Sequence, residues 1–294
     1  MGTDGFLVID KSSGMTSHDV VAIARRALGT KKVGHAGTLD PMATGVLVLG
    51  FGIGTRLLQY ITNGEKSYEA TVVLGSSTVT DDSEGEVLEI AAEEKLSSIT
   101  DEMIEQALVP MRGVIHQRPS SVSAVKVSGQ RAYDRVRAGE KVKLASREVA
   151  ISKLEILDIR RSAEKIEFDI SVTCGPGTFI RAIARDCGDV LEVGGHLNRL
   201  RRTRVSPFDL SIAVSVDDLK AGKFEPISVE QVARMRFPIR EVDVYEQGEL
   251  QFGRALSVNS TGDLTAAIAN GELLALLINR GGKASPIAVF SVAS

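Results

Sequence analysis

The chain has 294 residues, of which 43% are hydrophobic, and a net charge of −3 at pH 7, a composition that supports a packed core in one large or two smaller domains and argues against a general nucleic-acid coat. No apolar run approaches the roughly 18 residues of a membrane span and no signal-peptide pattern opens the chain, so we expect a cytoplasmic protein without membrane contact. The two cysteines and four scattered histidines show no metal-ligand spacing, which argues against a structural metal.

The chain opens with a predicted strand and a predicted helix. Residues 6–9 form an apolar run typical of a short buried strand, and Lys11 begins the polar turn that ends it. Thr16 or Ser17 can cap the helix that follows, apolar residues recur along one of its sides, and Gly29 ends it.

The next stretch, residues 34–45, is a candidate functional loop. Its three glycines permit close approaches that a side chain would forbid, and Pro41 fixes the backbone after Asp40. The apolar run 46–49 then predicts a buried strand. We interpret the stretch as a tight loop that presents Asp40 as a reactive carboxylate; an aspartate that only bonds its own turn is the alternative. A phosphate-binding loop is rejected, because the G-K-[ST] ending is absent and a carboxylate would repel phosphates.

The middle of the chain separates acidic from basic residues. A glycine-rich turn at 50–56, a short helix at 57–61 and a strand at 69–74 come first. Tyr68, which heads that strand, is either a core residue or a stacking surface for a base. Ten acids lie between residues 81 and 105, across a polar loop and a predicted helix, and nine bases lie between 112 and 147. Such sorting can steer a polyanion to one face of the molecule, or it can be solvated surface.

The basic segment 112–147 is a predicted RNA contact. Pro119 argues against a continuous central strand here, residues 120–127 are prone to β-structure, and residues 131–137 predict a short helix. We interpret the segment as an irregular insertion that emerges from the core.

The second half of the chain contains another glycine-rich loop next to a predicted helix. Strands are predicted at 149–159 and 165–172, and a helix at 182–191. The loop between them, residues 174–179, also permits close approach, and it places Arg181 next in the chain as a candidate cation; an ordinary surface arginine is the alternative. Arg199 and Arg202 belong to a second basic cluster that can bind a polyanion.

From residue 226 onward, short alternating segments are separated by glycine or asparagine, at 255–258, 264–269, 273–278 and 287–292. They predict a small C-terminal β domain at 239–294, after a domain at 1–238. The larger domain lacks the regular strand–helix alternation of a parallel sheet. We therefore predict an α+β fold with a mostly antiparallel mixed sheet.

Residues 34–47, GHAGTLDPMATGVL, resemble the signature of the TruB family of tRNA pseudouridine synthases. Other stretches of that family recur in the same order, namely DKSSGMTS at 10–17, KSY at 66–68, TDDSEG at 80–85, RP at 118–119, SAVKV at 123–127, RAY at 131–133 and GTFIR at 177–181. The resemblance covers about residues 5–238.

The resemblance implies an enzyme that isomerises uridine 55 in the T-arm of tRNA to pseudouridine, without cofactor or metal. It implies that Asp40 is the catalytic carboxylate, that Arg181 pairs with it, and that Tyr68 packs on the target base. His35 is similar to the histidine that helps to displace the uridine. We expect a monomer with no obligate protein partner.

The remaining residues that we expect at the substrate form two groups. Phe179 and Leu200 resemble the apolar walls of the family's pocket. Four basic side chains are expected to contact the RNA: Lys11, Lys126, Arg199 and Arg202.

Three positions depart from the family pattern. Ser12 stands where a proline is usual, and Val122 stands where many members have an aromatic residue. The C-terminal segment resembles the family's PUA RNA-binding domain only loosely.

The expected reaction breaks the C1′–N1 glycosidic bond of a base flipped out of its stack and joins C1′ to C5. Arg181 would keep Asp40 ionised and orient it. Attack of Asp40 at C1′, attack at C6 and removal of a C2′ proton all stay open. Two other classes of function are a non-catalytic RNA-binding module, which would not need Asp40, and a nucleosidase, which would release free uracil.

Overall fold

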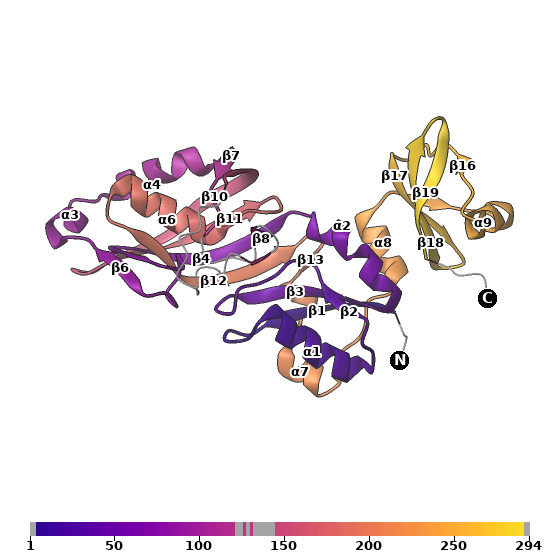
Figure 1. Ribbon diagram of the computed structural model, residues 1–294, viewed down its shortest axis with the longest axis horizontal. Coiled ribbons are helices and arrows are strands. Elements are labelled where there is room, and N and C mark those ends of the chain that lie inside the picture. Colours follow the sequence, from indigo (N-terminus) through magenta and orange to yellow (C-terminus); the bar gives the residue numbers. More distant parts are fainter. Residues whose placement is uncertain (1–3, 121–125, 128–129, 132–144, 291–294) are drawn as a thin grey trace.

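The computed structural model describes residues 4–120, 126–127, 130–131 and 145–290. Its larger part is built on a sheet whose strands are β1 (Gly5–Lys11), β2 (Val33–His35), β3 (Thr44–Phe51), β4 (Lys66–Leu74), β7 (Gly113–Gln117), β10 (Arg147–Arg161), β11 (Ile166–Cys174), β12 (Gly195–Val205), β13 (Phe208–Asp209) and β14 (Val214–Ser215). The order is β14-β1-β3-β12-β4-β11-β10-β7, with β13 beside β12 and β2 beside β3 (Figure 1). Among these described strands, β1 with β14 and β3 with β12 are parallel and the other pairs are antiparallel, which confirms the predicted α+β class.

The helices of this part are α1 (Ser17–Leu28), α2 (Leu58–Thr62), α3 (Glu93–Ser97), α4 (Asp101–Leu108), α6 (Ile180–Leu191), α7 (Val216–Lys220) and α8 (Val229–Arg236), with 3₁₀ turns at Gly52–Leu57, Val109–Met111 and Leu210–Ile212. Two short hairpins are β5 (Ser76–Thr78) with β6 (Val87–Ile90), and β8 (Lys126–Val127) with β9 (Gln130–Arg131).

Helix α1 begins and ends as its sequence predicts. Thr16 is the N-cap and forms a reciprocal capping box with Asp19, and Gly29 ends the helix in the left-handed conformation with φ 64°.

The sheet is buried on both faces at β1 because two apolar clusters cover it. Leu7 and Ile9 pack into a cluster shared with α1, α4, α6 and α7, whereas Phe6 and Val8 pack into a cluster shared with α2 and α8. Alternate residues of a strand point to opposite faces, so the short apolar run fills both layers.

The C-terminal part is a second sheet, of β15 (Ile239–Glu241), β16 (Leu256–Ser257), β17 (Leu264–Ala269), β18 (Glu272–Arg280) and β19 (Lys283–Val289), with helix α9 (Val244–Gln251). The order is β15-β17-β18-β19-β16. The last strand lies earlier than the predicted 287–292, because Gly281 and Gly282 form the hairpin turn with positive φ and strand pairing resumes at once. This sheet joins the Phe6 cluster through Ile268, Leu276 and Phe290.

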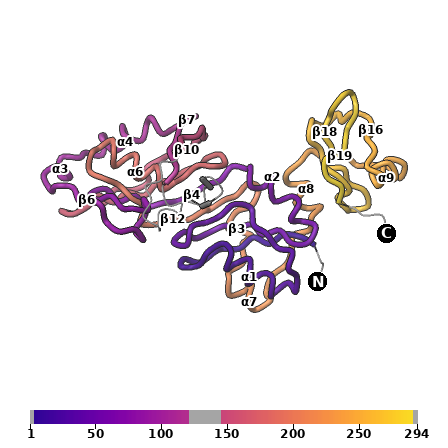
Figure 2. Tube along the Cα trace, in the orientation of Figure 1, coloured from indigo at the N-terminus to yellow at the C-terminus, as the bar shows by residue number. Residues whose placement is uncertain are grey.

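The central strands bring together segments that are far apart in the sequence. Arg202 on β12 lies opposite Gly45 at the start of β3 and opposite Tyr68 on β4, and Tyr68 lies opposite Val172 on β11. In Figure 2 the purple β3 and the orange β12 accordingly run side by side. The loop before β3, the head of β4 and the loop after β11 therefore meet at one place.

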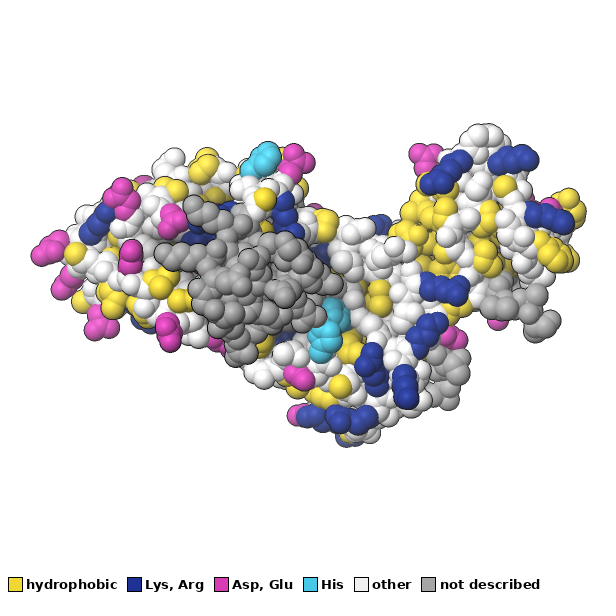
Figure 3. Space-filling model, in the orientation of Figure 1, with side chains coloured by type: hydrophobic (Ala, Val, Ile, Leu, Met, Phe, Trp, Pro, Cys, Tyr) yellow, Lys and Arg dark blue, Asp and Glu magenta, His cyan; other side chains and the backbone are white. Residues whose placement is uncertain are grey.

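Within the predicted basic insertion, the structure describes residues 112–120, 126–127, 130–131 and 145–147. Strand β7 ends at Gln117, before Pro119, and is the edge strand of the sheet, which agrees with the reading of that proline. The helix predicted at 131–137 lies largely outside the described residues. Figure 3 shows Asp and Glu side chains around α3 and β6, and Lys and Arg side chains over α1 and the C-terminal sheet. No helix in the described part of the chain combines the length and apolar character needed to cross a membrane.

Candidate active site

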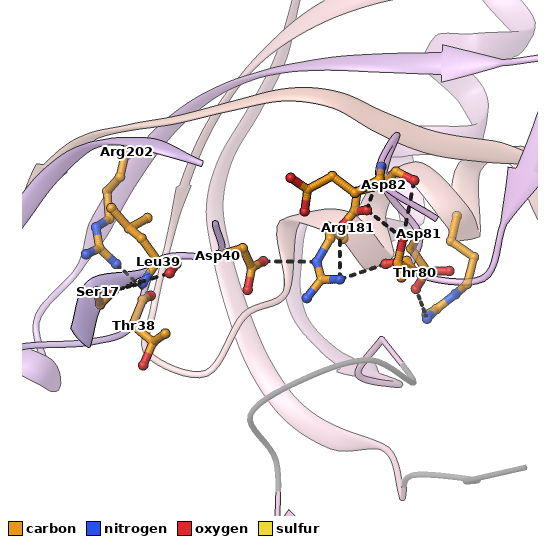
Figure 4. Close-up of polar contacts among 11 residues, drawn as sticks. Ser17, Thr38, Leu39, Asp40, Thr80, Asp81, Asp82, Arg181 and Arg202 are labelled. Atoms are coloured by element: carbon orange, nitrogen blue, oxygen red, sulfur yellow. Dashed lines mark hydrogen bonds and ion pairs between the residues drawn. The ribbon is translucent and has the colours of Figure 1, made fainter. Parts of the chain in front are cut away.

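The loop that carries Asp40 is fixed by hydrogen bonds to its backbone. The Ser17 hydroxyl at the start of α1 accepts a hydrogen bond from Leu39 N at 2.9 Å. Arg202 donates to the carbonyls of Thr38 and Gly37 at 3.3 and 3.1 Å (Figure 4). The loop is thus anchored from α1 and from β12, and this anchoring fixes where the carboxylate lies.

Lys11, at the end of β1, also holds this loop in place, and it is buried where a substrate cannot contact it. Its side chain is fully buried, and its ammonium group donates to the carbonyls of Ser12, Met15 and Pro41 at 2.9, 2.7 and 3.1 Å. Burial lowers the pKa of Lys11 to about 8, and the negative charge of Asp40 opposes this shift by raising the pKa. The expectation of a direct RNA contact is corrected: Lys11 is a positioning residue.

Arg202 also lies inside the protein, with 1% of its surface exposed. Besides the two loop carbonyls, it donates from Nε to the carbonyl of Val46 at 2.8 Å. The expectation that it contacts RNA phosphates at the surface is therefore wrong, because its donors are committed to backbone oxygens.

Arg181, near the start of α6, holds two carboxylates at once. Its Nε lies 3.0 Å from Asp40 Oδ2, and its Nη1 lies 3.0 Å from Asp82 Oδ2 and donates to the carbonyl of Thr80 at 2.7 Å. In Figure 4 Arg181 lies between Asp40 on one side and Thr80 and Asp82 on the other. The side chains of Arg181 and Asp82 are 6% and 5% exposed, whereas that of Asp40 is 36% exposed. The ion pair thus has a buried cation and a carboxylate that reaches open space.

Asp82 was missed from the sequence as a site residue. The available signal was its place among Thr80, Ser83 and Gly85, small residues that favour a turn able to bury an acid. In the structure the Asp82 carboxylate accepts hydrogen bonds from Thr80 Oγ1 at 2.5 Å and from Glu84 N at 3.1 Å. These bonds hold the carboxylate in place behind Arg181.

Asp40 opens into a cavity of about 380 Å³. Tyr68, Phe179 and Leu200 line this cavity together with Asp40 and Arg181, as does the glycine-rich loop at 175–178. Burial raises the pKa of the Tyr68 phenol, which keeps it neutral. The volume and the mixture of apolar walls with a few charged groups fit a single planar ring and its sugar.

His35 and Arg199 are not among the residues that line this cavity. His35 is half-buried at the end of β2, its ring 5.6 Å from that of His18, and burial lowers the pKa of His35. Arg199 is exposed and points to the opposite face of β12 from Leu200, where its Nη2 lies 3.9 Å from Glu69, so it does not line the cavity, and its expected contact with RNA phosphates stays a prediction. Lys126 lies on β8, and its side chain is outside the described residues.

Two further basic residues, Lys66 and Arg147, line the cavity and were not predicted. Lys66 is the lysine of the KSY stretch, two positions before Tyr68, and Arg147 is the last residue of the basic segment 112–147, so both belong to stretches that the sequence had singled out. Across the residues that the structure describes, no group of three or more His, Cys, Asp or Glu side chains is arranged to hold a metal ion.

Family models match the chain over three consecutive ranges. Residues 25–180 match the model described as TruB family pseudouridylate synthase (N terminal domain). Residues 181–235 match the tRNA pseudouridylate synthase B C-terminal domain, and residues 237–291 match the model described as tRNA Pseudouridine synthase II, C terminal.

Full-length relatives and solved structures agree with these matches. A protein of Corynebacterium diphtheriae named tRNA pseudouridine synthase B is 45% identical over 290 residues, which cover 98% of this chain and 97% of the relative. One of the same name from Nocardia farcinica is 48% identical over 286 residues, covering 97% and 92% of the two chains. A chain of a solved Cbf5-Nop10-Gar1 complex superposes with a TM-score of 0.70 at 25% identity, covering 99% of this chain and 86% of that chain.

Proposed function

The chain belongs to the TruB family of pseudouridine synthases, and we propose that it isomerises uridine 55 in the T-arm of tRNA to pseudouridine. The observation that carries the proposal is the Asp40–Arg181 pair, in which the carboxylate reaches the cavity and its cation is buried behind it. A buried cation fixes the direction of its carboxylate partner without occupying the space in front of it.

The reaction requires the target base to leave its stack, because C1′ and C5 are out of reach inside a folded loop. The cavity can receive the flipped uridine with Tyr68 on one side and the apolar side chains of Phe179 and Leu200 on others. Asp40 then lies at the wall of the same cavity, where it can act on the nucleotide.

The isomerisation balances within the substrate. The C1′–N1 bond breaks, the uracil turns in the pocket, C5 bonds to C1′, and the proton on C5 is lost while N1 gains one. Asp40 assists this exchange as a nucleophile or as a base. Walls that keep the detached uracil beside C1′ and exclude water favour rejoining over hydrolysis.

The proposal also assigns a role to each of the two domains. Residues 1–238 form the catalytic domain, and residues 239–294 form a PUA-like domain that contacts the RNA outside the T-loop. Tyr68, Phe179 and Leu200 shape the pocket, and His35 displaces the uridine from the loop.

The test is base-resolved mapping of pseudouridine in an unmodified tRNA transcript incubated with the protein, with Asp40→Asn as the matched control. We expect conversion at position 55 alone, no free uracil, and less than a thousandth of the wild-type turnover for Asp40→Asn with tRNA binding retained. Release of uracil would indicate a nucleosidase. Conversion by Asp40→Asn near the wild-type rate would refute the catalytic assignment.

A further inference from the structure

Cations outnumber carboxylates around the cavity. Lys66, Arg147, Arg181 and Arg202 line it, and Asp40 is the one carboxylate among the described lining residues. A nucleotide that enters such a cavity carries a phosphodiester on each side of its ribose. A cation with uncommitted donors at the mouth of the cavity would meet that charge.

Three of the four cations are already committed to the protein. Arg181 serves two carboxylates and a carbonyl. Arg202 serves three carbonyls. Lys66 donates to two carbonyls at 2.7 and 2.8 Å, and burial lowers its pKa to about 8. All three side chains are buried.

Arg147 differs from them in both respects. It is half-buried at the start of β10 and donates from Nη2 to the carbonyl of Gly177 at 2.5 Å. Its Nε is buried and has no hydrogen-bond partner, and within the described ranges no carboxylate pairs with it. An arginine has five N–H donors, so most of the donors of Arg147 have no partner among the residues that the structure describes.

The contacts of Arg147 also orient those unused donors. Its guanidinium carbon lies 4.5 Å from the centroid of the Phe179 ring, so one face of the group is covered by the wall of the pocket. A guanidinium donates in its own plane, and stacking leaves that edge available. The carbonyl of Gly177 holds the group at this position, in a loop whose glycine has φ 86°.

We propose that Arg147 binds a phosphodiester of the target uridine, so that the pocket recognises a nucleotide in its RNA backbone and not only a base. The inference rests on the proposed function, because it assumes that a flipped nucleotide occupies the cavity. The planar edge of Arg147 matches two phosphate oxygens, and the aromatic wall holds the edge beside the ribose.

The test uses a T-arm stem–loop RNA in three forms: unmodified, or with one uncharged methylphosphonate on the 5′ or the 3′ side of the target uridine. Single-turnover rates are measured against enzyme concentration for the wild type, Arg147→Gln and Arg147→Lys. The matched control is Arg160→Gln, an exposed arginine farther along β10 whose Nη1 pairs with Asp158 and Asp169.

We expect the wild type to lose about tenfold in affinity when one of the two phosphates is neutralised. Arg147→Gln should bind the unmodified RNA about tenfold more weakly, lose nothing further with that methylphosphonate, and show a salt slope smaller by about one unit. Arg147→Lys should keep part of the sensitivity, because it keeps the charge but not the planar edge. Arg160→Gln should behave as the wild type.

Equal binding of all three RNAs by the wild type would overturn the inference, as would an Arg147→Gln variant that keeps the full sensitivity to both methylphosphonates. A purely structural arginine predicts the latter outcome. If Arg147→Gln does not fold, the wild-type comparison and Arg147→Lys decide. Failure of the wild type to form pseudouridine in the unmodified RNA would instead refute the proposed function, so the two failures are distinguishable.

Discussion

Asp40 and Asp82 both pair with Arg181, yet we expect their replacement by asparagine to have different consequences. Asp40→Asn should remove activity and leave stability nearly unchanged. Asp82→Asn should lower the stability of the protein and, because it releases one side of Arg181, also slow the reaction. The difference follows from burial, since the Asp82 side chain is 5% exposed and the Asp40 side chain is 36% exposed.

The magnitudes follow from the contacts of each carboxylate. Removing one partner of a buried ion pair costs about 3–5 kcal/mol, whereas a pair open to solvent contributes about 0–1 kcal/mol. Asparagine keeps one acceptor oxygen for Thr80 or the Glu84 amide, so we place Asp82→Asn near the lower value, about 3 kcal/mol. In a chain of this size that is about 5 °C in melting temperature.

The assay combines thermal and chemical unfolding of the two variants with single-turnover rates at saturating RNA. A melting temperature of Asp82→Asn within about 1 °C of the wild type would refute the reasoning from burial. So would an Asp40→Asn variant that is the less stable of the two. The double variant tests coupling, because both carboxylates contact Arg181 and their effects should not add.

Three further predictions follow from the same geometry. Arg181→Lys keeps the charge but cannot reach both carboxylates in one plane, so the single-turnover rate should fall at least tenfold and stay above that of Arg181→Met; equal rates for the two variants would contradict the role of geometry. Gly45→Ala should destabilise the protein strongly and lower its activity, because a Cβ there would lie 2.1 Å from Arg202 O at φ 99°, and an unchanged unfolding midpoint would contradict this. Lys11 has a pKa of about 8 in the folded state and an ordinary pKa of 10.5. Between these two pH values the unfolded chain binds more protons than the folded protein, so the contribution of Lys11 to the free energy of unfolding rises with pH. The rise is at most about 1.4 kcal/mol per pH unit. The stability of the wild type minus that of Lys11→Met, measured by denaturant unfolding at pH 8 and pH 10, should therefore increase, and a flat or falling difference would contradict the pKa shift.

Much of the fold near the site could be predicted from local patterns. The caps of α1, the buried run of β3 and the effect of Pro119 are decided by neighbouring residues, and each element formed where its pattern indicated. Strand β12 was not predicted, because its leucines are interspersed with arginines that hide an apolar face. Arg199 and Arg202 therefore read as one basic cluster, although β12 sends them to different faces and buries the second.

The site was harder to predict because burial is a property of the whole fold. A lysine after a strand, such as Lys11, is usually exposed, and only the convergence of three carbonyls makes its burial tolerable. Asp82 and Arg181 are 99 positions apart, and their contact depends on how α6 packs against the loop after β5. Sequence patterns carry no record of such distances.

The apolar cluster that contains Phe6 also contains Ala36, four residues before Asp40, and Ile268 and Leu276 of the C-terminal sheet. The C-terminal sheet therefore packs against the same apolar cluster as the loop that carries Asp40. The Arg56 guanidinium adds a hydrogen bond to the carbonyl of Val289 at 2.6 Å. A chain that ends at residue 238 would expose the apolar side chains of this cluster to solvent. We expect the truncated chain to be destabilised and prone to aggregation, and not to be a smaller active enzyme.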